Sequence, residues 1–471
     1  MGERLGQVMA GRWGWLVVAA LATFFLLLHP IGFTGGGADD ARYLEAARCW
    51  AAQGGMCLPD NHWATRWPAL APIALGIGLF GEGRTSVGLG TLAGWIASIA
   101  LIGLIGRMWS DRTAGLLAAA LFASIPLVSA WATQPSVDLI ELAFQLGALA
   151  LATVAYRRQS AVLAGAAGVA AALAVQSRET SLIFCGVAAL VWLTLDKQRR
   201  QILLWSLVGF GGAMALEMVA YAVATGDPLA RYRLSLSHVA IPSPELKPSV
   251  DTSKSPLLNP DYIAGWKRAM GIELWWPIDP WLNLVASPLI GPWLLAAIGL
   301  GIAGKGDGRT VAGRVGLAAG LVALLLVYGL AVDPKPRMFL LAAAAAVLVI
   351  AWATTGLVRR GKGLVPIAVV ALLFALGAVV TGKLPDTKAL ESAGRQWIAA
   401  HPGQIESDAR TVGVLTLLPE ARALPPVWSS RPLRLVIATT DCATLAAGRA
   451  RVVAEEQSSA GTLCLVSPTK N

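Results

Sequence analysis

The chain has 471 residues, of which 56% are hydrophobic and only 14% are charged, and its mean hydropathy is +0.62. Soluble domains carry about 25% charged residues, so this composition excludes an ordinary soluble protein and predicts a polytopic α-helical membrane protein. The net charge of +10 does not indicate a nucleic-acid partner, because the basic residues fall mainly in short loops between apolar segments, where they set membrane orientation.

Apolar segments recur along the chain, and a helix needs about 20 such residues to cross a bilayer. We predict about 11 transmembrane helices, at residues 13–32, 85–106, 113–132, 137–156, 160–176, 180–195, 201–223, 285–303, 314–332, 338–357 and 364–382. The first segment lacks an A-x-A-like cleavage site, so we expect it to be retained. The stretch from Pro68 to Phe80 is too short to span, and we expect it to lie along the interface or to re-enter.

The loops predict how these helices are oriented. With the N-terminus inside, every predicted inside loop is basic, as at Arg107 and Arg112, whereas the short outside turns around Pro135 and Ser177 are nearly free of Lys and Arg. An odd number of spans then places the C-terminal tail outside.

The predicted outside segments are two large loops, at about 33–84 and 224–284, and the tail. We expect residues 1–383 to form a transmembrane catalytic domain and residues 384–471 to form a small α/β domain. In the tail we predict strands at TVGVLTLL, LRLVIATT and TLCLVS, and a helix from Ala443 to Glu456.

The cysteines favour an oxidising compartment for these outside segments. Cys49 and Cys57 share the first loop, and Cys442 and Cys464 share the tail, which makes two local pairs. Cys185 stands alone in a span. The alternative is that the five cysteines are unrelated.

Ionisable residues gather at the predicted outer ends of the spans. Asp39 and Asp40 directly follow the first span, and Asp138, Glu141 and Gln145 share one helix face at the start of the fourth. Further outer-end residues are Arg66, Arg178, Glu179, His238, Lys335 and Arg337. A transporter would place such groups near the bilayer midplane, so one-sided clustering favours a catalytic site at the outer face.

A transfer reaction from a sugar on polyprenyl phosphate needs three kinds of group. A carboxylate takes the proton from the attacking hydroxyl, positive charge stabilises the departing phosphate, and an apolar groove holds the lipid. The chain supplies all three at one membrane face.

The segment DDARYLEAA, directly after the first span, resembles the DE-x-R-Y-x-E motif of the lipid A aminoarabinose transferases. These enzymes belong to the glycosyltransferase C (GT-C) superfamily, with the protein O-mannosyltransferases as more distant relatives. The resemblance covers about residues 14–350 as an ordered series that continues through RWPALAP, LFGEGRTSVGLG, the Asp138 segment, AALAVQSRETS, GDPLARYRLSLSHVA and PRMFLLAAAA.

By position, the resemblance implies roles for individual residues. Asp39 matches the catalytic aspartate and is expected to be the general base, and Asp40 is expected to orient that base or to help hold a divalent metal. Arg178 and Arg337 are expected beside the lipid phosphate. His238 lies near the position of a metal-associated histidine.

One departure leaves the metal open, because Arg66 stands about where those enzymes have a glutamate thought to bind metal. An arginine in that place offers its own positive charge to the phosphate. The remaining residues that we expect to contact substrate are Tyr43, Asp138 and Glu179.

Each candidate also has a purely structural alternative. Helix capping would explain the carboxylates of Asp39, Asp40 and Asp138. Arg178 and Glu179 would then pair with each other in their turn. Headgroup anchoring would explain Arg66 and Arg337, and His238 would be an ordinary loop residue.

The sequence as a whole predicts a glycosyltransferase of the bacterial inner membrane with its active site facing the periplasm. It is expected to move a monosaccharide from a polyprenyl-phosphate donor to a glycolipid, polysaccharide or protein acceptor, and the family resemblance implies inversion of the anomeric centre. The alternatives are a lipid-linked sugar transporter or flippase, and a non-catalytic envelope assembly subunit.

Overall fold

The computed structural model describes residues 13–32, 39–55, 57, 62–193, 197–236, 274, 278–304, 309–326, 336–380, 387–426, 431–438, 441–443, 450–458 and 461–468. The chain divides into two compact units. The first comprises residues 1–28, 93–132 and 137–380, and the second comprises residues 29–92, 133–136 and 381–471. The second unit therefore joins the first predicted outside loop to the C-terminal tail.

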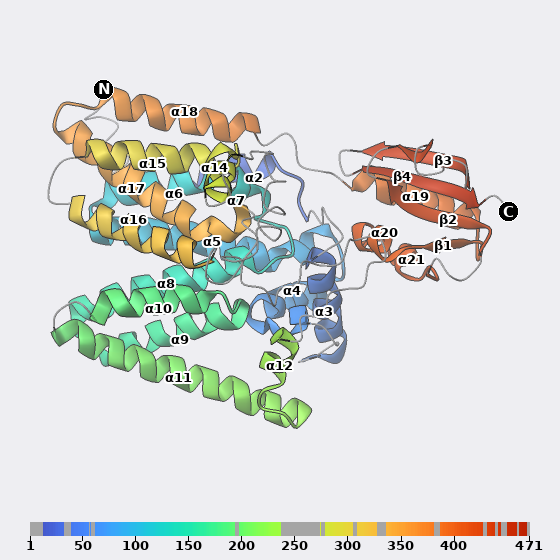
Figure 1. Ribbon diagram of the computed structural model, residues 1–471, viewed down its shortest axis with the longest axis horizontal. Coiled ribbons are helices and arrows are strands. Elements are labelled where there is room, and N and C mark those ends of the chain that lie inside the picture. Colours follow the sequence, from blue (N-terminus) through green and yellow to red (C-terminus); the bar gives the residue numbers. More distant parts are fainter. Residues whose placement is uncertain are drawn as a thin grey trace. The chain divides into compact units, whose positions relative to one another are not determined.

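The first unit is a bundle of helices (Figure 1). Its elements are α2 (Gly14–Leu27), α5 (Arg84–Trp109, in this unit from Ala93 onward), α6 (Arg112–Ala123), α7 (Pro126–Ala130), α8 (Asp138–Arg158), α9 (Ala161–Ser177), α10 (Ser181–Leu193), α11 (Lys197–Thr225), α12 (Ala230–Leu236), α14 (Asp279–Ala286), α15 (Gly291–Ala303), α16 (Arg309–Leu324), the 3-10 turn η4 (Pro336–Phe339), α17 (Leu340–Arg359) and α18 (Leu364–Val380).

Every predicted span contains a helix of this bundle. Among the described residues, four helical stretches are long and apolar enough to cross a membrane, at 84–109, 138–158, 199–225 and 336–359. The other apolar helices are shorter. The predicted span 113–132 is interrupted, because α6 ends at Ala123 and Pro126 starts the separate helix α7. The number and orientation of the spans remain predictions.

Glycines let α9 and α11 pack backbone against backbone. A Cβ atom on Gly209 of α11 would lie 2.0 Å from the carbonyl oxygen of Gly165, and one on Gly168 of α9 would lie 1.8 Å from that of Ser206. Small residues at such positions allow helices to approach closely in an apolar environment, where dispersion forces hold them together.

The second unit begins with three short elements, α3 (Asp39–Gln53), η1 (His62–Thr65) and α4 (Trp67–Phe80). The apolar stretch that the sequence singled out is thus a helix of 14 residues. Leu44 and Ala47 of α3 pack against Ile73 of α4 and Val87 of α5, and Leu417 from the C-terminal segment covers the same cluster.

The C-terminal part of this unit holds α19 (Lys388–Ala400), α20 (Ala409–Val414), α21 (Pro419–Arg422) and the strands β1 (Ile405–Ser407), β2 (Leu433–Ala438), β3 (Ala450–Ser458) and β4 (Gly461–Pro468). The strand order is β1-β2-β4-β3, with β1 and β2 parallel and the other pairs antiparallel (Figure 1). Leu390 of α19 packs on Leu435 and Leu463 of the sheet in one buried core.

Two predictions for the tail were wrong. TVGVLTLL is helical over its first part, because the Asp408 side chain accepts the Thr411 N–H and caps α20. The predicted helix from Ala443 to Glu456 is strand β3 from Ala450 onward. Antiparallel pairing with β4 outweighs the helix propensity of its Ala and Glu residues, and exposed and partly buried residues alternate along β3. The strands predicted at LRLVIATT and TLCLVS are confirmed as β2 and β4.

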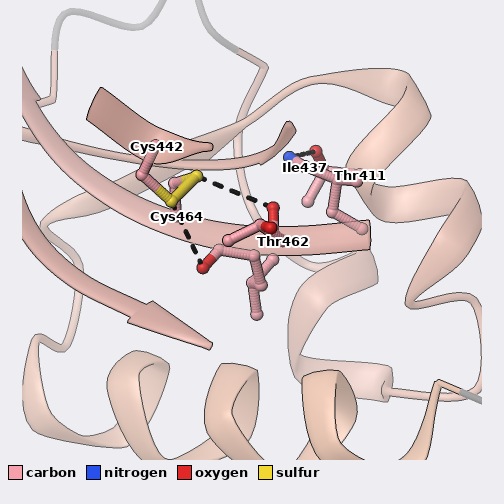
Figure 2. The surroundings of a disulfide bond; sticks show 6 residues. Thr411, Ile437, Cys442, Thr462 and Cys464 are labelled. Atoms are coloured by element: carbon pink, nitrogen blue, oxygen red, sulfur yellow. Dashed lines mark hydrogen bonds between the residues drawn. A yellow bond between two sulfur atoms is a disulfide. The ribbon is translucent and has the colours of Figure 1, made fainter. Parts of the chain in front are cut away.

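Both predicted cysteine pairs form disulfides. Cys49–Cys57 closes the end of α3, with Cα atoms 5.7 Å apart, and Cys442–Cys464 joins the segment after β2 to β4, with Cα atoms 5.6 Å apart. Figure 2 shows the second bond beside Thr411 of α20, whose hydroxyl accepts the Ile437 N–H of β2 at 2.8 Å. Cys185 is the free cysteine.

The close contact between α9 and α11 predicts which glycine of α11 tolerates a methyl group. Gly209→Ala should lower the free energy of unfolding by about 1–3 kcal/mol, because the added carbon overlaps the Gly165 carbonyl. Gly212→Ala on the same helix meets nothing within 4 Å and serves as the matched control. Thermal unfolding in detergent measures both variants. Equal stability of the two would contradict this packing.

Candidate functional site

The aspartate pair opens helix α3 in the second unit. Asp39 is partly exposed and Asp40 is buried, and both lie in the first turn of the helix. Unsatisfied backbone N–H groups at a helix start give it a partial positive charge, which favours the ionised form of a carboxyl group there. The first turn of α3 is therefore suited to keep a carboxylate available as a base.

The buried Tyr43 follows this turn in α3, and the buried Arg66 contacts Tyr43. Tyr43 is 2% exposed and accepts a hydrogen bond at its hydroxyl from the Arg66 guanidinium, which also lies 5.8 Å from the centre of its ring. Arg66 itself is 9% exposed and directly precedes α4. In η1, the rings of His62 and Trp63 contact each other in a tilted arrangement, with their centres 3.7 Å apart. Arg66 is thus a buried cation held by an aromatic partner, which does not fit simple headgroup anchoring.

A polar cavity of about 40 Å³ lies in the first unit, among the N-terminal part of α8, the turn between α9 and α10, and η4. Asp138, Glu141 and Gln145 line it together, which confirms the shared helix face predicted from their spacing. Arg178 and Arg337, which are distant in sequence, also line this cavity. The structure therefore brings together the two arginines that the sequence placed beside a phosphate.

Hydrogen bonds and ion pairs hold this cavity in shape. An Arg178 guanidinium N–H donates to Asp138 Oδ1 at 2.5 Å, and the same nitrogen lies 3.6 Å from Glu141 Oε2. Ser181 Oγ donates to Glu141 Oε1 at 2.6 Å, and Gln145 Nε2 donates to Ser181 Oγ at 2.8 Å. Asp138 is the first residue of α8 rather than its N-cap, which is Val137, so the capping alternative was wrong for this residue.

Arg337 reaches the cavity from η4. Its guanidinium lies 5.1 Å from the ring centre of Trp131, which is a favourable distance for a cation–π interaction. This contact with Trp131 helps to hold the guanidinium at the cavity.

A second buried ion cluster was missed in the sequence. Arg231 of α12 is 1% exposed, and it donates to Glu217 Oε1 of α11 at 2.8 Å and to Glu179 Oε1 at 3.0 Å. Burial alone would lower the pKa of Arg231, but the charges of Glu179 and Glu217 outweigh it and raise that pKa, so the guanidinium stays ionised. Ser235 Oγ donates to the same Glu179 oxygen.

These contacts separate the roles of two adjacent residues. Arg178 pairs with α8 and faces the polar cavity, whereas Glu179 pairs with α12. The spacing of Glu217 and Arg231, 14 residues apart across a turn, carried no periodic signal. Only the length of α11 and the reversal at Gly226, where φ is 75°, bring them together.

An apolar cavity of about 100 Å³ lies among α8, α9, α10 and α11. Phe184 lines both this cavity and the polar one, so the two are neighbours. Most of the lining consists of small side chains, including Ala148, Ala167, Ala171 and Ala188. Its lining residues lie nearer the middle of helices α8–α11, whereas the polar cavity lies at the helix ends.

The candidate residues therefore fall into two groups. Asp39, Asp40, Tyr43 and Arg66 lie in the second unit, and Asp138, Arg178, Glu179 and Arg337 lie in the first. His238 and Lys335 lie outside the described residues. In the described part of the chain no group of three or more His, Cys, Asp or Glu side chains is placed to hold a metal ion, so the metal expected at Asp40 and His238 remains a prediction.

Comparison with known proteins identifies the fold. A family model described as dolichyl-phosphate-mannose-protein mannosyltransferase matches residues 50–223. The crystal structure of ArnT from Cupriavidus metallidurans bound to undecaprenyl phosphate is 17% identical, with a TM-score of 0.59, and the match covers 97% of this chain and 98% of that chain. No curated protein sequence matches the chain.

Archaeal oligosaccharyltransferases share the same fold. The enzyme of Archaeoglobus fulgidus tethered with an acceptor peptide is 13% identical, with a TM-score of 0.52, over 90% of this chain and 61% of that chain. AglB from the same organism, with an inhibitory peptide and a dolichol-phosphate, is 14% identical, with a TM-score of 0.50, over 89% and 61%. The resemblance to GT-C glycosyltransferases is thus confirmed, and the chain has the fold of these membrane proteins.

The Arg231 cluster predicts a matched pair of stability effects. Arg231→Met should cost about 3–5 kcal/mol of folding free energy, because it leaves Glu217 buried without its counter-charge. Arg233→Met, two residues away, removes an exposed arginine that pairs with Asp227 at 3.3 Å and should change stability by about 0.5 kcal/mol or less. Thermal unfolding in detergent compares the variants. Equal losses would argue against a buried ion pair.

Proposed function

We propose that the chain is an integral-membrane glycosyltransferase that moves a monosaccharide from a polyprenyl-phosphate donor to an acceptor at the periplasmic face of the inner membrane. The observation that carries this proposal is the meeting of Arg178 and Arg337 at one polar cavity next to an apolar cavity. A lipid phosphate has these two parts, an anionic head and an apolar tail. The fold shared with an ArnT bound to undecaprenyl phosphate supports the same donor class.

The proposed reaction is a single displacement. The acceptor hydroxyl oxygen attacks the anomeric carbon, its proton passes to the Asp39 carboxylate, and the bond from that carbon to the phosphate oxygen breaks. The polyprenyl phosphate leaves with the bonding electrons, and the anomeric centre inverts. A positioned base of this kind contributes about 10²–10⁴-fold to the rate. Asp40 and Tyr43 follow Asp39 by one and four residues in α3 and are proposed to orient it and the acceptor.

The leaving phosphate gains negative charge as the bond breaks, so cations at the polar cavity favour the transition state. A guanidinium has five N–H donors, so Arg178 is able to keep its bond to Asp138 while it donates to a phosphate oxygen. Arg337 adds the second positive charge. We propose that Glu141 and Gln145, which line the cavity, contact hydroxyl groups of the sugar, and that Ser181 holds both side chains in place through its hydrogen bonds to them.

The apolar cavity is proposed to receive the part of the lipid chain that follows its first isoprene unit. Phe184 lines both cavities, and the other lining residues of the apolar cavity lie farther along helices α8–α11 from the polar cavity. Burial of each CH₂ group contributes about 0.8 kcal/mol, so even a short stretch of chain adds substantially to donor binding. Alanine side chains leave this space open.

A divalent metal, if bound, would be held by Asp40 and His238 and would supply positive charge to the phosphate. The buried Arg66 guanidinium is the alternative source of that charge.

Replacing the proposed base tests the function. In cells at matched expression, Asp39→Asn should behave like a deletion: one sugar is lost from an envelope acceptor, and the lipid-linked donor accumulates. Asp227→Asn, a carboxylate already paired with an exposed arginine, is the control and should retain transfer. Mass spectrometry of envelope glycolipids, glycans and lipid-linked sugars identifies both substrates. Wild-type behaviour of Asp39→Asn beside a defective deletion would support a transport or assembly role instead.

Filling the apolar cavity tests the donor's tail. Ala171→Leu should weaken binding of undecaprenyl phosphate by about tenfold while leaving a phosphate with a short prenyl chain unaffected, since only the long chain reaches the cavity. Ala215→Leu on the exposed side of α11 is the matched control. Lipid binding to purified protein, measured by native mass spectrometry, compares the chain lengths. An equal loss for both lipids would mean that the cavity does not hold the tail.

A further inference from the structure

Helix α3 is fixed from the C-terminal segment, at the end opposite its aspartates. Arg48, in the second half of α3, donates from one guanidinium nitrogen to the Thr416 carbonyl oxygen at 2.6 Å and to its hydroxyl at 3.2 Å. The same guanidinium donates to Glu82 Oε1 at 2.7 Å and 3.0 Å. The neighbouring disulfide Cys49–Cys57 closes this end of the helix.

Glu82 links α3 to a second C-terminal residue. Its carboxylate also accepts from Arg422 of α21, at 2.9 Å and 3.0 Å. Partial burial alone would raise the pKa of Glu82, but the hydrogen bonds and charges of Arg48 and Arg422 outweigh it and hold that pKa below its usual value. One carboxylate thus joins two arginines from distant parts of the chain.

A second ion pair lies at the start of α5. Arg84 donates to Glu391 Oε1 of α19 at 2.7 Å and to the Thr387 hydroxyl at 2.9 Å. Both charged side chains are mostly buried, with 19% and 16% exposed. Leu417 adds an apolar contact by covering the cluster between α3 and α4. We call this set of contacts the junction, defined by Arg48, Glu82, Arg84, Glu391, Thr416, Leu417 and Arg422.

From these contacts we infer that the C-terminal segment is a positioning element for the catalytic helix, rather than an appended domain that works independently. This inference rests on the proposed function, because it assigns Asp39 and Asp40 to catalysis. The junction fixes α3 at Arg48, between two and three helical turns from Asp39, and a helix transmits a displacement along its rigid axis. A misplacement of about 1 Å at a reacting group costs on the order of 10²-fold in rate.

The chemistry of the junction distinguishes this role from mere attachment. A flexible tether would need no shared carboxylate and no bond to a backbone carbonyl. Contacts from α19, α21 and the segment between α20 and α21 reach α3 at Arg48, the turn between α4 and α5 at Glu82, and the start of α5 at Arg84. Glu82 and Glu391 act through other residues and are therefore positioning residues.

Charge reversal of the Arg84–Glu391 pair tests the inference. The single variants Arg84→Glu and Glu391→Arg should each reduce sugar transfer in cells by at least tenfold at matched expression, and the double variant should recover to within about threefold of wild type. Arg395→Glu is the control, since Arg395 is 64% exposed and pairs with Glu420 at 3.7 Å within the same segment. It should leave transfer unchanged. Failure of the double variant to recover would overturn the inference.

Two readouts keep this test independent of the proposed chemistry. Hydrogen exchange in the α3 peptide 39–53 should be faster in the single variants and normal in the double variant, whether or not Asp39 is the base. Affinity for undecaprenyl phosphate should be unchanged, because that lipid is assigned to the first unit. Arg422→Gln, a milder change, should speed exchange in α3 to a smaller extent. Faster exchange with full transfer, or unchanged exchange in all variants, would each refute positioning by the junction.

Normal sugar transfer by the Asp39→Asn variant would instead refute the proposed function. The hydrogen-exchange result for α3 would still test the positioning role of the junction. The two failures are therefore distinguishable.

Discussion

A charged side chain that is buried in apolar surroundings needs an oppositely charged partner close by. Without one, the free-energy cost of removing the charge from water far exceeds the stabilisation that most single interactions in a fold supply. The helical unit meets this constraint twice at its helix ends, with Arg178 between Asp138 and Glu141 and with Arg231 between Glu179 and Glu217. Both ion clusters include a residue of the short turn between α9 and α10. That turn is consequently held from two sides, and the polar cavity keeps its shape around it.

The same constraint explains why the polar cavity lies at the helix ends. Deeper along α8 to α11 the cavity lining is mostly alanine, leucine, isoleucine and phenylalanine, and no charged side chain of the described residues lines the apolar cavity. Close backbone packing at Gly165, Gly168 and Gly209 brings α9 and α11 together, while alanines elsewhere leave a gap. The polar and the apolar cavity are therefore two different environments that share one aromatic ring, Phe184.

Local sequence signals predicted the features that depend on short spacing. The helix within each apolar span, the shared face of Asp138, Glu141 and Gln145, and both cysteine pairs follow from periodicity or proximity along the chain. Features that depend on distant partners were not predictable in this way. Arg231 has no periodic pattern to reveal its burial, and the residues of β3 favour a helix until β4 pairs with them. The ion pair between Arg422 and Glu82 likewise has no signal in the sequence around either residue.

The junction has a consequence for biogenesis. Arg48 and Thr416 are 368 residues apart, so the contact between them forms only after nearly the whole chain has been made. At about 5–20 residues per second, translation of that interval takes on the order of 20 to 70 seconds, during which the N-terminal part of the chain is already emerging. Throughout that time α3 lacks its C-terminal contacts. A ribosome that stops early therefore releases a protein with most of its apolar helices but without the contacts that fix the proposed catalytic helix.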